Sequence, residues 1–402
     1  MAYQNVGTPR FYINDFSYAK SIGHDLENTH KYDTTNSYLR NHLTIEDYYK
    51  LIDGDPTNLC IIDTSSTGRR EYLFMYNLPK KRTDKATNYL AFLNHNFADA
   101  KSHFHVRYID EAGLHNGTIP LTEILNANID GINIYASSSS NWGRPNNNGI
   151  SIYGLNGGTQ LDTSLDDVYQ FRFYLDDDDF GKIQNTDGAT TKLQIGSMFM
   201  GRYYDMPHSP ELDVTMTIEN DGYDAITTQG GAHLTNIKYN GNPNWEREEG
   251  FFTTINGDTT TYDATSHPSW TIGEPTAVGR RRGRRVWSMN FKYLSSQDLF
   301  SSNYMSNTYV QDGNDSSNDD YNTNNDLVTD RSAFEYTLED DDSFVAQVLN
   351  KAGNGQRFIF QPDNTNNNPD QFAICQLDQD SLNIKQVANG VYDISLKIRE
   401  VW

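Results

Sequence analysis

The chain has 402 residues, which is long enough for two or three domains that each bury a core of their own. Its formal net charge of −22 disfavours general binding to nucleic acid or to anionic membranes. Only two cysteines, Cys60 and Cys375, are present, which excludes a disulfide framework and leaves no C-x-x-C spacing for zinc. We expect both to be buried free thiols.

The aromatic content favours a β protein. Hydrophobic residues make up 36% of the chain and aromatic residues 12%, with 26 Tyr and 19 Phe. Each ring buries a large area, so a core can form from fewer apolar residues, and aromatic side chains suit pleated sheets. The opening MAYQNVGTPR has no basic-then-apolar signal, and no apolar run reaches the ~18 residues of a membrane span. We expect synthesis in a cytoplasm and no membrane partner.

Alternation of apolar and polar residues predicts half-buried antiparallel strands along the whole chain. The runs are 102–109, 169–175, 212–218, 287–293 and 391–402. In the third run the predicted inward residues are Leu212, Val214, Met216 and Ile218, and in the fourth they are Trp287, Met289, Phe291 and Tyr293. The fold class is therefore predicted to be all-β.

One helix is predicted from Ser343 to about Ala352, with Asp342 as its cap and Gly353 at its end. Phe344, Val345, Val348 and Leu349 form its apolar stripe. A second, weaker helical segment is predicted near Asn88–Leu93.

Long Asn-rich loops occur at 140–149, 309–327 and 361–370, and the second of them is acidic and without apolar periodicity. Composition places boundaries near residue 45 and near 195–210, and no fixed-period repeat indicates a propeller or solenoid.

Two clusters contain residue types that bind metal ions. The run Asp176–Asp179 offers carboxylates for calcium, but it lacks the D-x-[DN]-x-[DN]-G spacing and follows a strand, so a solvated turn is expected. His103 and His105 share a strand face near His95, but no third zinc ligand follows at a recognised spacing. We expect no metal and no cofactor.

The segment Gly279–Arg285 reads GRRRGRR. Such a run is typical of nucleic-acid or localisation patches, but the acidity of the chain opposes DNA. Arginine also forms forked pairs with carboxylates, so we expect this segment to contact an acidic face of a neighbouring subunit. The predicted subunit-contact residues are Arg280, Arg281, Arg282, Arg284 and Arg285.

No catalytic motif supports an enzyme. The chain lacks G-x-S-x-G, G-x-x-x-x-G-K-[ST] and H-E-x-x-H, although a glycosidase needs only two of its 54 acidic residues. We expect no enzymatic activity, with a polysaccharide-degrading enzyme as an alternative. Trp142 and Tyr153 lie beside Gly/Asn-rich loops and are candidates for stacking on sugars, or else anchors of those loops.

Three blocks of sequence resemble the distal-tail family of structural proteins of tailed bacteriophages, as in marine and cyanobacterial phages. The first is MAYQNVGTPRFYIN; the second is SMFMGRYYDMPHSPELDVTMTIENDG at 197–222 with TTQGGAHLTNIKYN at 227–240; the third comprises GRRVWSMNFKYLSSQDLF at 283–300, FIFQPDNTNNNPDQFAICQLDQDS at 358–381 and QVANGVYDISLKIREVW at 386–402. The acidic loop at 309–327 departs from plain tail-tip relatives.

The resemblance implies a virion protein of the tail. It implies a homo-oligomeric ring, a hexamer in such families, that joins the tail tube to the hub or fibres and binds no specific nucleic-acid sequence. Residues 1–44 would be an N-terminal arm of the ring domain, 45–200 an inserted antiparallel β-sandwich similar to galactose-binding domains, and 201–402 the tail-ring β domain with one packed helix. Alternatives are a carbohydrate-binding adhesion module and a neck connector.

Overall fold

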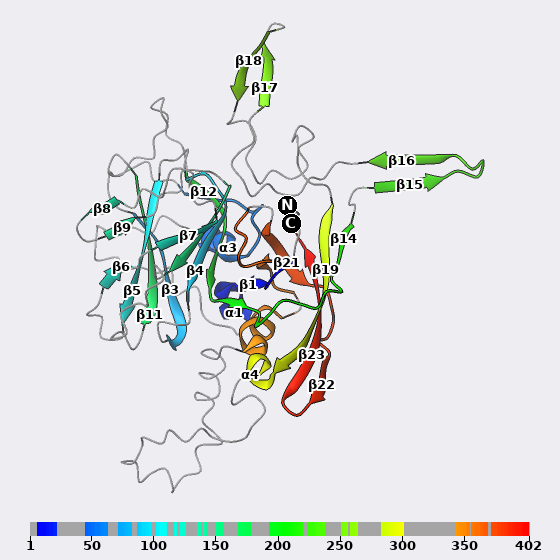
Figure 1. Ribbon diagram of the computed structural model, residues 1–402. Helices are drawn as coiled ribbons and strands as arrows, with labels where there is room; N and C mark the ends of the chain where they lie inside the picture. Colours follow the sequence, from blue (N-terminus) through cyan, green and yellow to red (C-terminus); the bar gives the residue numbers. More distant parts are fainter. Residues whose placement is uncertain are drawn as a thin grey trace.

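The chain is mostly β, so the all-β prediction is confirmed. The structure is a computed structural model. It describes residues 6–21, 45–62, 71–82, 87–97, 102–110, 116–118, 121–125, 135–137, 140–142, 149–155, 168–177, 193–219, 223–237, 251–255, 258–263, 283–300, 343–353, 355–368 and 371–401. In some of the strands within these ranges, the backbone is described but the side chains are not. The described strands form three larger sheets, which lie in layers in Figure 1, and three two-stranded sheets, two of which project from the body as hairpins.

The large sheet has eight antiparallel strands drawn from distant parts of the chain. Its order is β13-β1-β20-β21-β23-β19-β14, and β22 pairs with β23 beside this path. The strands are β1 (Arg10–Tyr12), β13 (Tyr203–Asp205), β14 (Thr215–Glu219), β19 (Arg284–Ser295), β20 (Phe358–Gln361), β21 (Ala373–Leu377), β22 (Ile384–Ala388) and β23 (Val391–Glu400).

Two further sheets come from the part of the chain between β1 and β13. The middle sheet has the order β2-β12-β4-β10-β7, and the outer sheet has the order β3-β11-β5-β6. The middle strands are β2 (Cys60–Ile62), β4 (Tyr89–His95), β7 (Leu121–Leu125), β10 (Gly149–Leu155) and β12 (Leu193–Gly201). The outer strands are β3 (Glu71–Arg82), β5 (Ser102–Asp110), β6 (Asn116–Thr118) and β11 (Val168–Asp177).

The middle sheet is buried on both faces. Leu90 and Phe92 of β4 point to one face, where they pack with Phe104 of β5 in the outer sheet. Alternate residues of the same strand, such as Ala91 and Leu93, point to the other face and pack against the large sheet. Near-continuous apolar strands are expected where both faces are covered, and β4 and β10 are of this kind.

The large sheet buries its other face against the predicted helix. Phe344, Val348 and Ala352 pack on aromatic and aliphatic residues of β1, β19, β20 and β23. The segment is helical as predicted, but Val345–Leu349 (η3) has π-helical turns and only Asn350–Ala352 (α6) is α-helical. Gly353, with φ +53°, follows its last residue, as expected for a helix end. Ser343 Oγ accepts the Ala346 N–H at 3.3 Å, while Asp342 lies outside the described residues.

Three helices were not foreseen. They are α1 (Asp15–Ser21), α3 (Ile45–Ile52) and α4 (Ser296–Leu299). Tyr48, Leu51 and Ile52 give α3 an i, i+3, i+4 apolar face that packs on the middle sheet. The weaker helix predicted near Asn88–Leu93 is wrong, because this segment is β4 and pairs with β10 and β12.

All five predicted strands exist, but some inward residues were wrong. Leu212 lies before β14 and is fully exposed, and Ile218 is 48% exposed because β14 is the last strand at its edge. Tyr293, with φ +61°, is 75% exposed. The register of β19 against β23 shifts between Phe291 and Leu294, and this bulge turns Leu294 inward in place of Tyr293. Cys60 and Cys375 are free and buried, as predicted.

Two buried ion pairs connect distant segments. Arg285 of β19 contacts both carboxylate oxygens of Glu400 at 3.1 Å and donates to the Phe372 carbonyl at 3.0 Å. The side chains of Arg285 and Glu400 are 1% and 2% exposed. Lys351 of α6 likewise contacts Asp15 of α1 at 3.2 Å, with exposures of 2% and 0%. Because removal of one buried partner leaves the other charge uncompensated, both pairs make the fold sensitive to single substitutions.

We predict that Glu400→Gln lowers the free energy of unfolding by about 3 kcal/mol or more, since the Arg285 guanidinium would stay buried without its counter-charge. Asp378→Asn is the matched control: its partner Lys397 lies 2.6 Å away but both side chains are partly exposed, so a loss below about 1 kcal/mol is expected. Urea unfolding of the two variants measures this. Equal losses would show that the Arg285–Glu400 pair has no special role.

Candidate functional site

The arginine segment divides at Gly283. Arg280, Arg281 and Arg282 lie outside the described residues, and their contact with a neighbouring subunit stays a prediction. Gly283 has φ +78°, and a Cβ there would lie 2.4 Å from the Glu219 carbonyl oxygen, so the turn into β19 requires glycine. Arg284 begins β19 and is partly buried.

Arg285 is not a subunit contact. Its guanidinium is buried and held by Glu400, and it lies 4.9 Å from the ring of Trp287. Such a side chain cannot reach another molecule without breaking a buried pair, so the prediction is wrong for this residue. Periodicity placed Arg285 on the same strand face as Trp287, and that shared face was the available signal for burial.

Tyr153 does not offer a sugar-stacking face. Its side chain is 2% exposed on β10, and its ring packs against Phe104 with the ring centroids 5.2 Å apart. Trp142 ends the short strand β9 (Ser140–Trp142), opposite Tyr135 of β8 (Tyr135–Ser137), and its side chain lies outside the described residues. The structure therefore opposes a sugar contact at Tyr153 and leaves Trp142 as a prediction.

His95 is a core residue of the middle sheet. Its Nδ1 accepts the Phe97 N–H at 3.4 Å, so Nε2 donates to Ser151 Oγ at 2.9 Å. Burial lowers the pKa of His95 to about 3, which keeps the ring neutral. His103 and His105 belong to β5 in the outer sheet, and their side chains lie outside the described residues.

The acidic clusters give no metal site in the part of the chain that the structure describes. Asp176 and Asp177 are the last residues of β11, and 178–179 lie outside the described residues, as does the acidic loop at 309–327. Among the described residues, no group of three His, Cys, Asp or Glu side chains is arranged to hold a metal ion.

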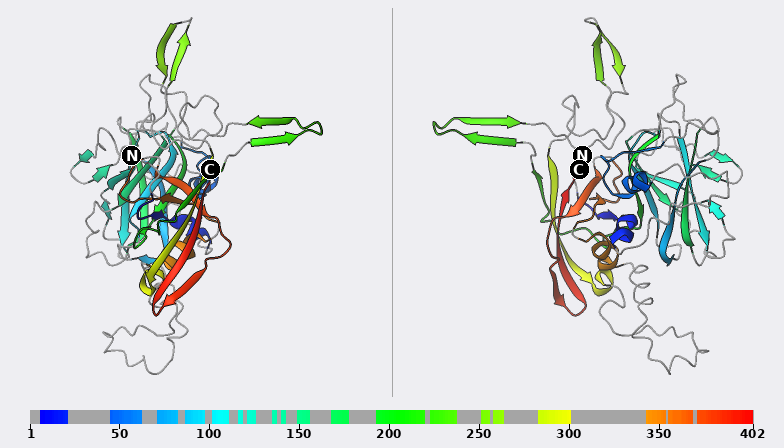
Figure 2. Two further views of the ribbon diagram at one scale, coloured as in Figure 1. Left: turned by 45° about the vertical axis from the view of Figure 1, so that its right-hand side comes forward. Right: turned by 180° about the vertical axis from the view of Figure 1, so that it is seen from behind.

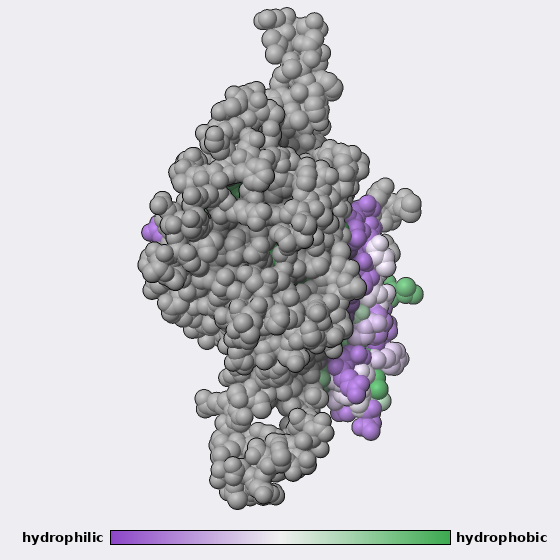
Figure 3. Space-filling model, turned by 90° about the vertical axis from the view of Figure 1, so that its left-hand side faces the viewer, coloured by the Kyte–Doolittle hydropathy of each residue, from purple (hydrophilic) through white to green (hydrophobic). Residues whose placement is uncertain are grey.

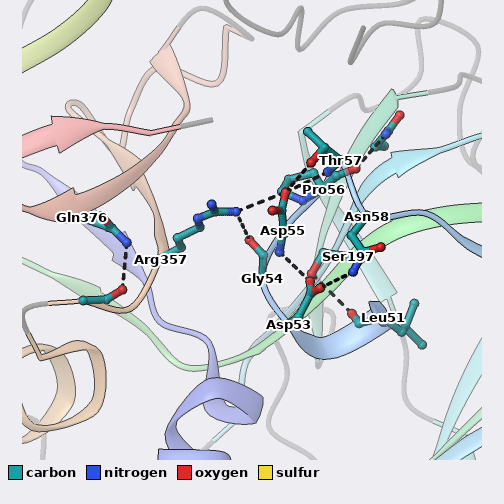
Figure 4. A network of polar contacts seen from close by, with 12 residues as sticks. Leu51, Asp53, Gly54, Asp55, Pro56, Thr57, Asn58, Ser197, Arg357 and Gln376 are labelled. Carbon is teal, nitrogen blue, oxygen red and sulfur yellow. Dashed lines mark hydrogen bonds and ion pairs between the residues drawn. The ribbon is translucent and has the colours of Figure 1, made fainter. Parts of the chain in front are cut away.

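The loop after α3 forms a polar bridge to the large sheet (Figure 4). Asp53 accepts the Asp55 N–H at 2.7 Å and the Asn58 amide at 2.8 Å, and Asp55 accepts both the N–H and the hydroxyl of Thr57. Arg357, next to β20, donates to the Gly54 carbonyl at 3.0 Å and lies 3.3 Å from Asp55 Oδ1. The loop is thereby fixed to the segment that leads into β20.

The two carboxylates of this loop have opposite pKa shifts. Burial raises the pKa of Asp53 above its ordinary value. Burial alone would also raise the pKa of Asp55, but the hydrogen bonds from Thr57 and the charge of Arg357 lower it overall. Because these groups bond one another, the arrangement is that of a structural bridge rather than a catalytic pair.

Two hairpins project from the sheets. Figures 1 and 2 show β15 (Tyr223–Thr227) with β16 (His233–Ile237), and β17 (Phe251–Ile255) with β18 (Asp258–Asp263), extending away from the body in all views. Each is a two-stranded sheet that no other described strand extends. On the first hairpin Ile226 and Leu234 are directly opposite each other and are 61% and 60% exposed.

The outward face of the large sheet near β14 is polar. Arg399 of β23 contacts Glu219 of β14 at 2.6 Å, and Ser395 donates to the Asn290 side chain at 2.7 Å across β23 and β19. Figure 3 views the molecule from the side of the outer sheet, and the coloured residues visible at its edge are mainly hydrophilic, with single apolar residues among them. The largest exposed apolar side chains beside this face include those of Leu212 and Ile218.

Comparison with models of protein families, with curated proteins and with solved structures finds no match to this chain. None of the helices in the described part of the chain has the length and apolar composition needed to cross a membrane.

Sequence reasoning missed the hairpin β15–β16, although its signals were present. Ile226 and Leu234 flank the Gly-rich turn TTQGGA, in which Gly231 has φ +81° and donates its N–H to the Thr228 carbonyl at 2.9 Å. Gly-rich turns between β-branched residues are typical of hairpins. That the hairpin would stand away from the sheets could not be read from these residues.

We predict that His95 makes the fold acid-sensitive in a defined way. Its folded-state pKa of about 3 lies below the unfolded value of about 6.5, so the unfolded chain takes up a proton that the native chain does not. The resulting loss in the free energy of unfolding is negligible above pH 7 and reaches about 2 kcal/mol at pH 5. The effect grows as the pH falls toward 3.

His95→Gln keeps a hydrogen-bonding group for Ser151 but cannot titrate. We expect the variant to lose about 2 kcal/mol less stability than the wild type between pH 8 and pH 5, as measured by urea unfolding at each pH. Identical pH dependence in the two proteins would contradict a neutral buried His95.

Proposed function

We propose that this chain is a structural, non-enzymatic virion protein of a phage tail, forming a ring at the distal end of the tail that joins the tube to hub or fibre proteins. One observation carries the proposal. The three blocks that resemble the distal-tail family lie at the start, in the middle and in the C-terminal part of the chain. Every strand of the large sheet nevertheless lies within one of these blocks or overlaps it. Segments that share a family resemblance and also one sheet are best explained as one ancestral domain.

The remaining sheets fit an insertion into that domain. The middle and outer sheets are built from residues between β1 and β13, two strands that are adjacent in the large sheet. They pack face to face through one core, in the manner of a β-sandwich. We propose that this unit is the inserted sandwich similar to galactose-binding domains; such a fold does not by itself imply sugar binding.

The chemistry of the buried groups supports a structural role. Asp15, Lys351, Arg285 and Glu400 are engaged in ion pairs inside the fold, and His95 is neutral and bonded to Ser151. A general acid or base must reach a substrate proton, and these groups are committed to packing contacts. The adhesion alternative is weakened by the burial of Tyr153, so it now rests on Trp142 alone.

The proposal predicts that the chain is part of the phage particle. Immunogold labelling of purified virions with antibody to this chain is expected to place gold at the far end of the tail, and the chain is expected in the mass spectrum of denatured virions. Label at the neck would move the ring to the head–tail junction and contradict the distal position. Absence from both assays would reject a virion role.

A further inference from the structure

We propose that the β15–β16 hairpin is an assembly arm that docks on the open edge of β14 in a second copy of this chain. The inference rests on the proposed ring, and it specifies which surfaces of two adjacent copies meet. The two elements that it joins are described parts of the structure, and each has an edge with which no other described strand pairs.

The donor is the hairpin. The described side chains from Asp224 to Thr235 are exposed apart from Thr228, which is partly buried, so the hairpin gains almost no stability from packing on its own body. An isolated two-stranded hairpin is only marginally stable in water. Its cross-strand pair Ile226 and Leu234 also places apolar surface in solvent. Docking on another surface would remove both deficits.

The charge of the hairpin permits a second copy of this chain, which carries both the arm and the open edge, as its partner. Two chains of net charge −22 repel each other wherever their acidic surfaces meet. Residues 223–237 contain one acidic residue, Asp224, and no Lys, Arg or Glu. The hairpin is therefore a projecting element that can approach a second acidic copy with little repulsion. An arm that binds a basic partner would instead be expected to carry several acidic residues.

The acceptor is the edge of the large sheet. Among the described strands, β14 pairs only with β19 and ends the order of that sheet, so its other side presents backbone groups to which a strand can be added. Ile218 on β14 is 48% exposed and Leu212 just before it is fully exposed. The edge thus combines open hydrogen-bonding groups with the apolar contacts that Ile226 and Leu234 require.

The position of the two elements gives the contact a direction. β15 follows β14 after three residues, and the arm extends away from β14 (Figure 1). Five-residue strands span roughly 17 Å. The arm of one copy then reaches the edge of the next, whose own arm stays free for a third. Such donor-to-acceptor contacts form a ring when the rotation between copies closes, whereas arm-to-arm contacts would stop at two copies.

Disulfide trapping tests the pairing, because the two native thiols do not interfere. Cys60 and Cys375 are buried, and burial raises the pKa of Cys60 to about 12. An Ile226→Cys chain mixed with an Ile218→Cys chain is expected to give a disulfide-linked dimer upon mild oxidation. The matched control is Ile61→Cys, which is equally exposed but lies on β2 of the middle sheet. At least a tenfold lower yield is expected for the control mixture.

Cross-linking of Ile226→Cys chains with each other would overturn the inference in favour of arm-to-arm pairing. Equal disulfide yields with Ile218→Cys and Ile61→Cys, or no product in any mixture, would also overturn it. The same pair introduced together, Ile226→Cys with Ile218→Cys, is expected to give a ladder of linked copies in purified virions. A chain present in virions without a ladder rejects this contact alone, whereas a chain absent from virions rejects the proposed function.

A second measurement avoids new thiols. Ile226→Ser with Leu234→Ser is expected to convert oligomers to monomers in mass photometry while the melting temperature of the monomer is unchanged, since these side chains pack on nothing described in their own chain. Val387→Ser on β22, 41% exposed in the wild type, is the control and should assemble normally. Unchanged assembly of the double variant would contradict the arm.

Discussion

β1 is hydrogen-bonded to β13 on one side and to β20 on the other, and its successive side chains point to opposite faces of the large sheet. Phe11 joins the core beneath the 343–353 helix, whereas Tyr12 joins the core shared with the middle sheet. The Tyr12 hydroxyl donates to Gln361 at 2.9 Å, and the Arg10 guanidinium makes two bonds to Asp205. Three residues near the N-terminus thus connect both cores, and the stacking of the sheets depends on them.

This arrangement explains why the two ends of the chain contribute to one sheet. The N-terminal strand β1 can lie between β13 and β20 only because the intervening residues form the middle and outer sheets and return at β13. The Asp15–Lys351 pair and the Arg357 contact to the loop after α3 then join the elements that flank this crossing. The fold is held together by contacts between segments that are distant in sequence.

Periodicity predicted strand positions well because alternation reports which residues can share a buried face. It failed at the β-bulge, where an irregularity in the register of β19 turns Tyr293 to the exposed face. It also failed at Ile218, which is exposed because its strand lies at the edge of the sheet. Arg285 illustrates a further limit: local charge suggested an exposed patch, but its partner Glu400 is 115 residues away. Such pairings require the topology, which no local pattern contains.

Hydrogen exchange on the free chain and on the proposed tail ring, isolated from virions, tests the account most directly. Amides of β1 and β20 are expected to exchange slowly in both samples, because they lie between two cores. Amides of β14 and of β15–β16 are expected to exchange rapidly in the free chain and to become protected in the ring. Rapid exchange of the hairpin in the ring, or slow exchange of it in the free chain, would contradict the role of β15–β16 as an arm.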